Sequence, residues 1–439
     1  MTNTSNSPPK LGEDVYRQSH ACALPVYSIL VDPFAINETA FHPFLKEFSR
    51  FETIKSLERS PLYRKVQPDI QRVLGHVWQG EFAQAVEPRG PEDPICAVAW
   101  NIERGIRGDA IARLLRDHPL LKEAGVLLLS ELDWGMARTQ NRFIARELAI
   151  VLGMNYAFAP CYLALTKGAG VEKNAAGENT ESLHGNALLS RFPMHRVHSL
   201  ALPNGKDKMR GAEKRIGSQR AVIADIEHPS GMFRTVSLHL DAHSSQHHRY
   251  LQMRRVLDHL RTLEPQLPTL VGGDWNTTTH NASRALYSIL GYCRRVLMGV
   301  RHVVANHYPY PDRWFERRLF RELERSGYEY RQFNMPGECT LHYNVEDIAA
   351  NLNMGEWVPQ WCFWFINRAL ERTGGECSMK LDWFAGSGIR ALQPASVISG
   401  LQEGGGRVSD HDPIALSFSL LHTSSPQPTL RRPTPYLSL

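Results

Sequence analysis

The sequence has no long apolar run and few cysteines, and both absences exclude classes of protein. No stretch of roughly 18 or more apolar residues occurs, so no membrane-spanning helix is expected. The seven cysteines are odd in number and scattered without a C-x-x-C spacing, which argues against a disulfide framework and a thiolate zinc site. The first residues also lack a basic region followed by an apolar stretch, as a signal peptide would have. These absences predict a cytoplasmic protein in a reducing compartment.

The composition is that of an ordinary globular protein, but its positive charge is concentrated in one segment. The chain has 439 residues, of which 42% are hydrophobic and 22% charged, and a net charge of +5. Residues 284–331 hold ten arginines, no lysine and five acidic residues, so this segment alone carries the excess. A basic helical face can attract phosphates or an anionic membrane, or it can be a solvated face with internal ion pairs. The sequence leaves these interpretations open.

Changes in composition divide the chain into three parts. Residues 1–94 are predicted to be a partly helical N-terminal extension with a helix break at Pro61, and 421–439 a mobile Pro/Ser/Thr-rich tail. Residues 95–420 alternate short apolar runs with helical patterns such as 138–153 and 247–263, which predicts an α/β domain. Within it, 284–375 is predicted to be a mostly helical insertion. The predicted strands are ICAVAW, VLLLS, NALLS, AVIADI, FRTVSLHL, PTLVGG, MKLDWFAG and PIALSFSL.

Polar side chains recur where the predicted strands end. Four strand ends carry two polar residues separated by one: Asn101 and Glu103, Glu131 and Asp133, His239 and Asp241, and Asp274 and Asn276. In an extended chain such residues project from the same face, so each pair is expected to point to one place. A strand-to-loop turn would explain any single pair. The whole set is less easily explained by turns, because it consists of carboxylate, amide and imidazole groups.

These groups have the chemistry of a metal-assisted phosphoryl site. Two further acidic segments, KLDWF with Asp382 and SDHDP with Asp410 and His411, complete the set. Hard oxygen ligands suit Mg²⁺ or Mn²⁺, which bind one or two carboxylates and take further oxygens from a phosphate substrate. Imidazoles next to carboxylates can donate protons or hydrogen bonds to a transition state. The residues therefore predict a Mg²⁺ or Mn²⁺ cofactor and a phosphoester substrate.

The motif order resembles that of a known superfamily. WNIERG, SELDWG, HGNALLSRFP, SLHLD, GGDWNT, KLDWF and SDHDP follow one another as in the endonuclease/exonuclease/phosphatase superfamily. The resemblance spans about residues 95–420 and is interrupted by the insertion. It implies a four-layer α/β sandwich, with two mixed β-sheets face to face, helices outside, and an active site at one edge.

The resemblance also implies a role for each site residue. Four side chains would surround the metal: Asn101, Glu103, Glu131 and Asp410. Asp274 would orient or deprotonate the attacking water, and Asn276 would help to hold it. His411 would contact the phosphate with Asp382 behind it, and His239 would contact the phosphate or the leaving group. Four residues are expected to support the site: Asp133, His184, Asn186 and Asp241. Asp133 could also replace or supplement Glu131, because residues two apart share a strand face.

Several alternatives remain at this stage. The segment HLDAHSSQHH offers a zinc-site interpretation through His239, Asp241, His243, His247 and His248. Phosphodiester cleavage, with nucleic acid as a candidate substrate, leads over sphingomyelinase-like or inositol-phosphate-type activity. A membrane surface is a less favoured partner, through the aromatic residues Trp357, Trp361, Phe363, Trp364 and Phe365. A non-catalytic binding protein of the same fold is the alternative of another class, and the sequence identifies no protein partner.

Overall fold

The computed structural model describes most of the chain outside its ends. The described residues are 41–84, 93–242, 244–277, 281, 285–344, 364, 368, 370, 371 and 374–421. The first 40 residues, His243, all of the aromatic cluster except Trp364, and the tail after Leu421 lie outside them. Among the described helices, none combines the length and the apolar character needed to cross a bilayer.

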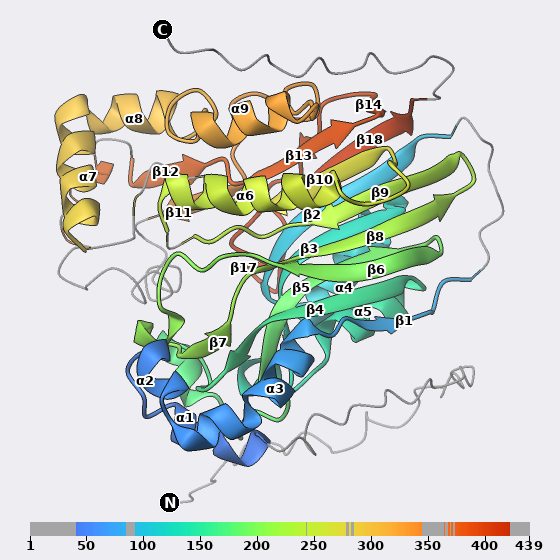
Figure 1. Cartoon of the computed structure of the whole chain (residues 1–439). Coiled ribbons are helices and arrows are strands. Elements are labelled where there is room, and N and C mark those ends of the chain that lie inside the picture. Colours follow the sequence, from blue (N-terminus) through green and yellow to red (C-terminus); the bar gives the residue numbers. More distant parts are fainter. Residues whose placement is uncertain are drawn as a thin grey trace, which may run out of the picture. The chain divides into compact units, whose positions relative to one another are not determined.

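Two mixed β-sheets form the centre of the fold (Figure 1). In the larger sheet the strands run in the order β1 (Trp78–Gly80), β4 (Asn155–Ala164), β5 (Leu183–Ser190), β3 (Val126–Trp134), β2 (Ile95–Arg104), β18 (Ile414–Leu420) and β14 (Ile389–Ala391), with β7 (Arg215–Gly217) paired to β4 and β15 (Ser396–Val397) to β18. The second sheet has the order β13 (Asp382–Ser387), β10 (Thr269–Asp274), β9 (Gly231–Ser237), β8 (Arg220–His228) and β6 (Met194–Ala201). Both sheets are mixed, since β2 and β3 are parallel, as are β9 and β10, whereas the outer pairings are antiparallel.

The two sheets pack face to face through an apolar core. Ala99 and Leu128 of the larger sheet belong to one buried cluster with Ala224, Leu270 and Phe384 of the smaller sheet. Alternate residues of these strands point inward, which is why the runs predicted as strands contain many small and branched apolar residues. The predicted four-layer arrangement is therefore confirmed.

Helices cover the outer faces of both sheets. The larger sheet is covered by α3 (Pro61–Gly75), α4 (Gly108–Asp117) and α5 (Ile144–Leu152), and the smaller by α6 (Gln246–Leu260) and α9 (Arg317–Arg325). In α6, Met253, Val256, Leu257 and Leu260 are buried at helical spacing, and the hydroxyl of Ser245 caps the first turn by accepting from the His248 amide. Outside the two sheets, β11 (Leu341–Asn344) pairs antiparallel with β12 (Glu376–Met379), and β16 (Gln402–Glu403) forms a short hairpin with β17 (Gly406–Arg407).

The described part of the N-terminal segment belongs to the same core. It contains α1 (Leu45–Phe48), α2 (Ile54–Glu58) and α3, followed by β1, which pairs antiparallel with β4. The helix break falls where Pro61 predicted it, because Pro61 begins α3, at a position where the missing amide proton costs no hydrogen bond. Phe48 and Tyr63 are buried together with Trp78, which places this segment against the outer face of the larger sheet.

The inserted helices are attached to the sheet domain by a buried ion pair. The insertion contains α7 (Ala285–Met298), α8 (Val300–Asn306) and α9. The guanidinium of Arg249 on α6 donates to Glu316 Oε1 at 2.8 and 2.5 Å, and both side chains have no exposed surface. A buried ion pair of this kind adds little stability by itself, but breaking it leaves a charge without its partner.

Replacing one partner of this pair should therefore destabilise the fold. Glu316→Ala is expected to lower the free energy of unfolding by about 3–5 kcal/mol, since Arg249 would stay buried without this carboxylate. Urea unfolding followed by circular dichroism measures the change. Glu324→Ala is the control, because Glu324 pairs with Arg331 at the surface and should cost less than about 1 kcal/mol. Equal losses in the two variants would contradict the prediction.

Candidate active site

The candidate site lies where strands from both sheets end. Asp274 is the last residue of β10 and pairs in register with Asp382, the first residue of β13. His411 lies in the loop before β18, and two hydrogen bonds hold its backbone, one from β2 and one within the same loop. The Trp100 indole nitrogen donates to the His411 carbonyl oxygen at 2.8 Å, and the Ser409 hydroxyl accepts from the His411 amide at 3.2 Å. Three separate segments are thus fixed around one point.

Asp274 is the centre of this group. Its Oδ2 accepts from Asn101 Nδ2 and from Asn276 Nδ2, each at 3.1 Å, and its Oδ1 accepts from the Asn276 amide at 2.8 Å. The Nε2 atoms of His239 and His411 lie 3.6 and 3.8 Å from Oδ2. Burial and the nearby Asp382 raise the pKa of Asp274 to about 6, although His411 acts in the opposite direction. Asp274 is therefore a carboxylate that can take up a proton near neutral pH.

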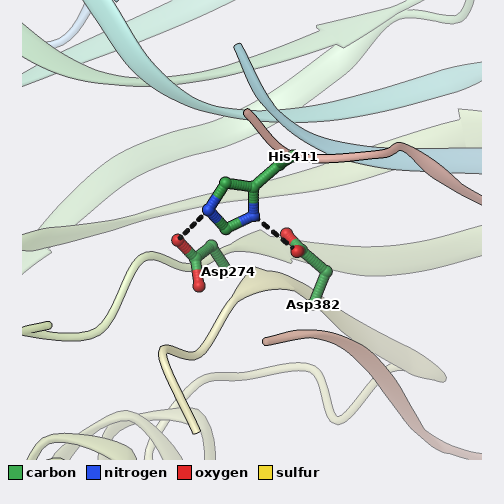
Figure 2. Close-up of side chains that lie close together, drawn as sticks. All are labelled: Asp274, Asp382 and His411. Carbon is green, nitrogen blue, oxygen red and sulfur yellow. Dashed lines mark hydrogen bonds and ion pairs between the residues drawn. The ribbon is translucent and has the colours of Figure 1, made fainter. Parts of the chain in front are cut away.

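His411 lies between two carboxylates, as Figure 2 shows. Its Nδ1 is 2.8 Å from Asp382 Oδ2, while its Nε2 faces Asp274. Burial lowers the pKa of His411, but Asp382 and Asp274 outweigh it and raise the pKa well above the ordinary value. The Thr340 hydroxyl accepts from the Asp382 amide at 3.2 Å, which fixes the start of β13. His411 is thus held as a cation with one ring nitrogen directed toward Asp274.

Three further acidic side chains, Glu103, Glu131 and Asp410, lie close enough to influence one another's pKa. Burial and the charges of Asp410 and Glu131 raise the pKa of Glu103 to about 8, although Arg104 opposes them. For Glu131, burial would raise the pKa, but Arg104 and His239 lower it below the ordinary value. Acidic side chains that repel one another are a suitable environment for a divalent cation. This set fits a bound metal, and the Asn101 side-chain oxygen, which accepts from the Glu103 amide at 3.1 Å, lies next to it.

A second group of atoms also has the spacing of a metal site. Ligand atoms of Asp274, Asp382 and His411 lie within 4.8 Å of one another. Both ring nitrogens of His411 already face carboxylates, Nδ1 toward Asp382 and Nε2 toward Asp274. The carboxylates Glu103, Glu131 and Asp410 are therefore the better candidates as ligands.

Backbone irregularities direct Glu103 and Glu131. Both residues adopt left-handed conformations, with φ of 46° and 58°, and the strand register shifts beside each of them. The irregularity at Glu131 interrupts the alternation of side chains along β3. The prediction that Glu131 and Asp133 share one strand face was based on that alternation. As a result the two residues have different partners: Glu131 faces His239 at 4.0 Å, whereas Asp133 binds Arg138 at 2.6 and 2.9 Å. Asp133 is thus engaged in an ion pair, which makes Glu131 the better candidate for a metal ligand.

Asp133 belongs to a buried ionic network that the sequence did not reveal. Arg138 also donates to Glu172 and Glu213, each at 3.0 Å, and His184 Nδ1 lies 2.8 Å from Asp133. The network is extended by Arg104, whose Nε is 3.1 Å from Glu172, and by Arg215, which pairs with Glu213. Arg104 connects the network to the site, because its charge lowers the pKa of Glu131. No spacing in the sequence indicated these partners, since most of them come from segments that are distant along the chain.

Two other predicted supporting residues lie in different surroundings. The Asn186 amide donates to the Arg220 carbonyl oxygen at 2.9 Å, a contact that joins β5 of the larger sheet to β8 of the smaller. Asp241 accepts from Lys208 at 2.8 Å and from the Gly205 amide at 3.3 Å. His248 Nε2 lies 2.9 Å from the Pro203 carbonyl oxygen. Within the described residues, this segment forms no group of three metal-ligating atoms as the zinc interpretation required, and His243 lies outside them.

Comparisons with known proteins assign the family. The Endonuclease/Exonuclease/phosphatase family matches residues 98–411, and the chain belongs to this family. Among curated protein sequences, none matches significantly.

Similar solved structures include an endonuclease/exonuclease/phosphatase from Beutenbergia cavernae, with 15% identity, a TM-score of 0.46, and coverage of 74% of this chain and 72% of that one. The human Nocturnin catalytic domain has 15% identity, a TM-score of 0.40 and coverage of 79% and 97%. A 3′–5′ exonuclease from Neisseria meningitidis has 15% identity, a TM-score of 0.42 and coverage of 74% and 100%.

The buried network predicts a pH-dependent loss of stability when Arg138 is replaced. Burial raises the pKa of Asp133 and Glu213, but Arg138 outweighs it and lowers both. Their stabilisation is therefore present above the unfolded pKa of about 4 and is lost as the pH falls through the lower folded values. In Arg138→Met, burial without the cation should raise the folded pKa values instead. That variant should lose stability as the pH rises from about 4 to 7.

Urea unfolding at pH 5 and pH 7 tests this sign. Arg138→Met should be less stable than the unmodified chain by about 3–5 kcal/mol at pH 7 and by less at pH 5. Arg116→Met serves as the control, because Arg116 pairs with Asp117 at the surface. A difference from the unmodified chain that stays constant between the two pH values would show that the carboxylates do not depend on Arg138.

Proposed function

We propose that this chain is a divalent-metal-dependent phosphoesterase that cleaves phosphodiester bonds by in-line attack of water. The observation that carries the proposal is the convergence of two amides and two imidazoles on Asp274. Phosphoryl transfer needs a proton acceptor for water and hydrogen-bond donors for the charge that develops on the phosphoryl oxygens. Family membership supports phosphoester hydrolysis as the reaction class.

Asp274 is the proposed proton acceptor. The water oxygen forms a bond to phosphorus while the bond to the leaving oxygen breaks, and the water proton passes to the Asp274 carboxylate. Its pKa of about 6 lies near neutral pH, where a general base is most effective. Asn101 and Asn276 hold the carboxylate through their amide groups and keep Oδ2 directed into the site.

His411 and His239 are the proposed donors to the phosphate. His411 is cationic between Asp382 and Asp274, so its Nε2–H can donate a hydrogen bond to a phosphoryl oxygen while the proton stays on the ring. His239 lies 3.6 Å from Asp274 and 4.0 Å from Glu131, between the proposed base and the proposed metal ligands. Removal of one such donor commonly slows a reaction by about 100-fold or more.

Mg²⁺ or Mn²⁺ is the proposed cofactor. Glu131, Glu103 and Asp410 would hold it, with the side-chain oxygen of Asn101 beside them. When bound, the ion neutralises negative charge on the phosphoryl oxygens. Burial and the charges of Asp410 and Glu131 raise the pKa of Glu103, and this supports the assignment, because a cation between the carboxylates would relieve their repulsion.

Nucleic acid is the proposed substrate class, and a lipid phosphodiester is the second candidate. The arginine-rich segment 284–331 supports nucleic acid, since guanidinium groups bind phosphate oxygens well. The second candidate is supported by α7, on which Ile289, Leu290 and Leu297 are exposed beside Arg294. The substrate panel described next also tests inositol phosphates, and it tests whether the chain only binds its ligand.

Loss of Asp274 should abolish turnover while the fold survives. Asp274→Asn keeps the shape of the side chain but removes the proton acceptor, so kcat should fall about 100-fold or more. The measurement is cleavage of single- and double-stranded DNA, RNA, sphingomyelin, inositol phosphates and bis-p-nitrophenyl phosphate with Mg²⁺ or Mn²⁺. Asp117→Asn at the surface is the matched control. Near-normal turnover by Asp274→Asn would remove this residue from the mechanism, and a chain that binds but cleaves nothing would support the binding role.

Loss of Glu131 should weaken metal binding independently of activity. Glu131→Gln removes one negative charge from the carboxylate set, so the dissociation constant for Mn²⁺ should rise at least about 10-fold. Calorimetric titration of the substrate-free chain measures it. Glu52→Gln, at an exposed position, is the control. Unchanged Mn²⁺ affinity in Glu131→Gln would show that the metal is held elsewhere.

A further inference from the structure

A cavity lies on the outer face of the smaller sheet, opposite to the candidate active site. It has a volume of about 440 Å³ and is bounded by α9, the loop around Tyr310, and the chain entering β13. Adjacent residues of β13 face the two sides: Asp382 contacts His411, whereas Trp383 packs in the outer core with Trp275 and Phe320. A volume of this size is within the range of small-molecule sites. None of the proposed catalytic or metal-binding residues lines it.

The inner wall of the cavity contains a buried lysine. Lys380 is only 2% exposed, and burial lowers its pKa to about 8. Its Nζ donates to the Glu338 carbonyl oxygen at 3.1 Å and lies 4.7 Å from the centre of the Trp383 ring. Within the described part of the chain, no carboxylate forms an ion pair with it. The charges of Asp382, Glu338 and Asp312 favour the ammonium form but do not outweigh its burial, so an anion in the cavity would stabilise the buried ammonium further.

Arginines outnumber acids on the outer wall, where Asp312 and Glu324 are the acidic residues that line the cavity. Arg317 and Arg321 lie one turn apart on α9, and Arg313 precedes the helix. The described residues form no ion pair with any of these three arginines, whereas Arg331 of the same cavity pairs with Glu324. Like charges one helical turn apart repel each other, so an anion bound to both arginines would stabilise this part of the helix. Guanidinium groups in this arrangement suit a phosphate, which they can bind through paired hydrogen bonds.

Aromatic rings lie beside these cations. The Arg313 guanidinium is 4.4 Å from the centre of the Tyr310 ring, and the Arg331 guanidinium is 4.8 Å from that of Tyr330. Trp383 and Tyr330 pack against each other at the base of the cavity, with ring centres 6.2 Å apart. Flat guanidinium and aromatic groups stack well on a planar heterocycle. The cavity thus offers a place for both a phosphate and a base.

We propose that this cavity binds a nucleotide, with the phosphate at Arg317, Arg321 and Lys380 and the base against the aromatic residues. The nucleotide is either a free mononucleotide or the phosphorylated end of a single-stranded nucleic acid, which share this chemistry. The proposal does not depend on the proposed function, because binding here needs neither the metal nor Asp274. The strand β13 connects the cavity to the site, since Trp383 follows Asp382 directly.

Calorimetric titration of the full chain with adenosine 5′-monophosphate in EDTA tests the proposal. EDTA removes divalent ions, so binding through a metal does not contribute. Saturable binding is expected at about millimolar concentrations or below. Arg317→Ala/Arg321→Ala should weaken it at least about 10-fold, because two charge-assisted contacts to the phosphate are lost. Adenosine and inorganic phosphate, tested separately, should each bind at least about 10-fold more weakly than the nucleotide.

The matched control is Arg318→Ala/Arg325→Ala, which removes two guanidinium groups from the same helix but none from the cavity wall. This variant should bind the nucleotide as the unmodified chain does. Absence of nucleotide binding, equal loss in the two double variants, or equally tight binding of inorganic phosphate or adenosine would each overturn the proposal. Single-stranded oligonucleotides with and without a 5′-phosphate distinguish the two sources. If the cavity binds the phosphorylated end of a strand, the 5′-phosphorylated oligonucleotide should bind as tightly as the mononucleotide. If it binds a free mononucleotide, both oligonucleotides should bind more weakly than the mononucleotide.

Discussion

The rest of the site depends on the burial of Asp274 opposite Asp382. These carboxylates face each other in adjacent antiparallel strands, where two negative charges would be strongly unfavourable without compensation. His411 provides that compensation by lying between them, and Asn101 and Asn276 donate hydrogen bonds to Asp274. The electrostatic cost of placing the carboxylates together is thus the reason for a cationic imidazole at this point.

The same physical rule explains the second buried group of charges. Arg104, Arg138 and Arg215 balance Asp133, Glu172 and Glu213 inside the domain, so this network is electrically complete. The set formed by Glu103, Glu131 and Asp410 is different, because these acids act on one another: the charges of Asp410 and Glu131, together with burial, raise the pKa of Glu103. A balanced network supports the structure, whereas an unbalanced one is suited to a cation from solution. This contrast separates the supporting acids from the candidate ligands.

The helical insertion adds a third distribution of charge. Arg331 of the insertion is paired with Glu324, whereas Arg313, Arg317 and Arg321 around the cavity form no ion pair with another described residue. Since Trp383 and Asp382 are neighbours on one strand, a ligand in the cavity would contact the strand that holds His411 in place. The insertion is therefore physically linked to the site, although it lies on the opposite face of the sheet.

The sequence by itself determined eight strands of the two sheets and the polar residues at their ends, but it missed β4 and β6. These features are local, because apolar runs and turn residues select strands and their ends without knowledge of partners. The seven motifs also carried the family resemblance, which the comparison over residues 98–411 bears out.

Only the tertiary structure decided which of the polar side chains belong to the site and which pair with residues around it. Period-two alternation wrongly placed Glu131 and Asp133 together, because a left-handed residue at Glu131 interrupts the strand. Asp133 is paired with Arg138 and contacts the distant His184, Asp241 is paired with the distant Lys208, and Asn186 makes a contact between the sheets. The cavity likewise combines an inserted helix with the start of β13. Such contacts depend on which distant segments meet, and no local pattern of residues encodes that.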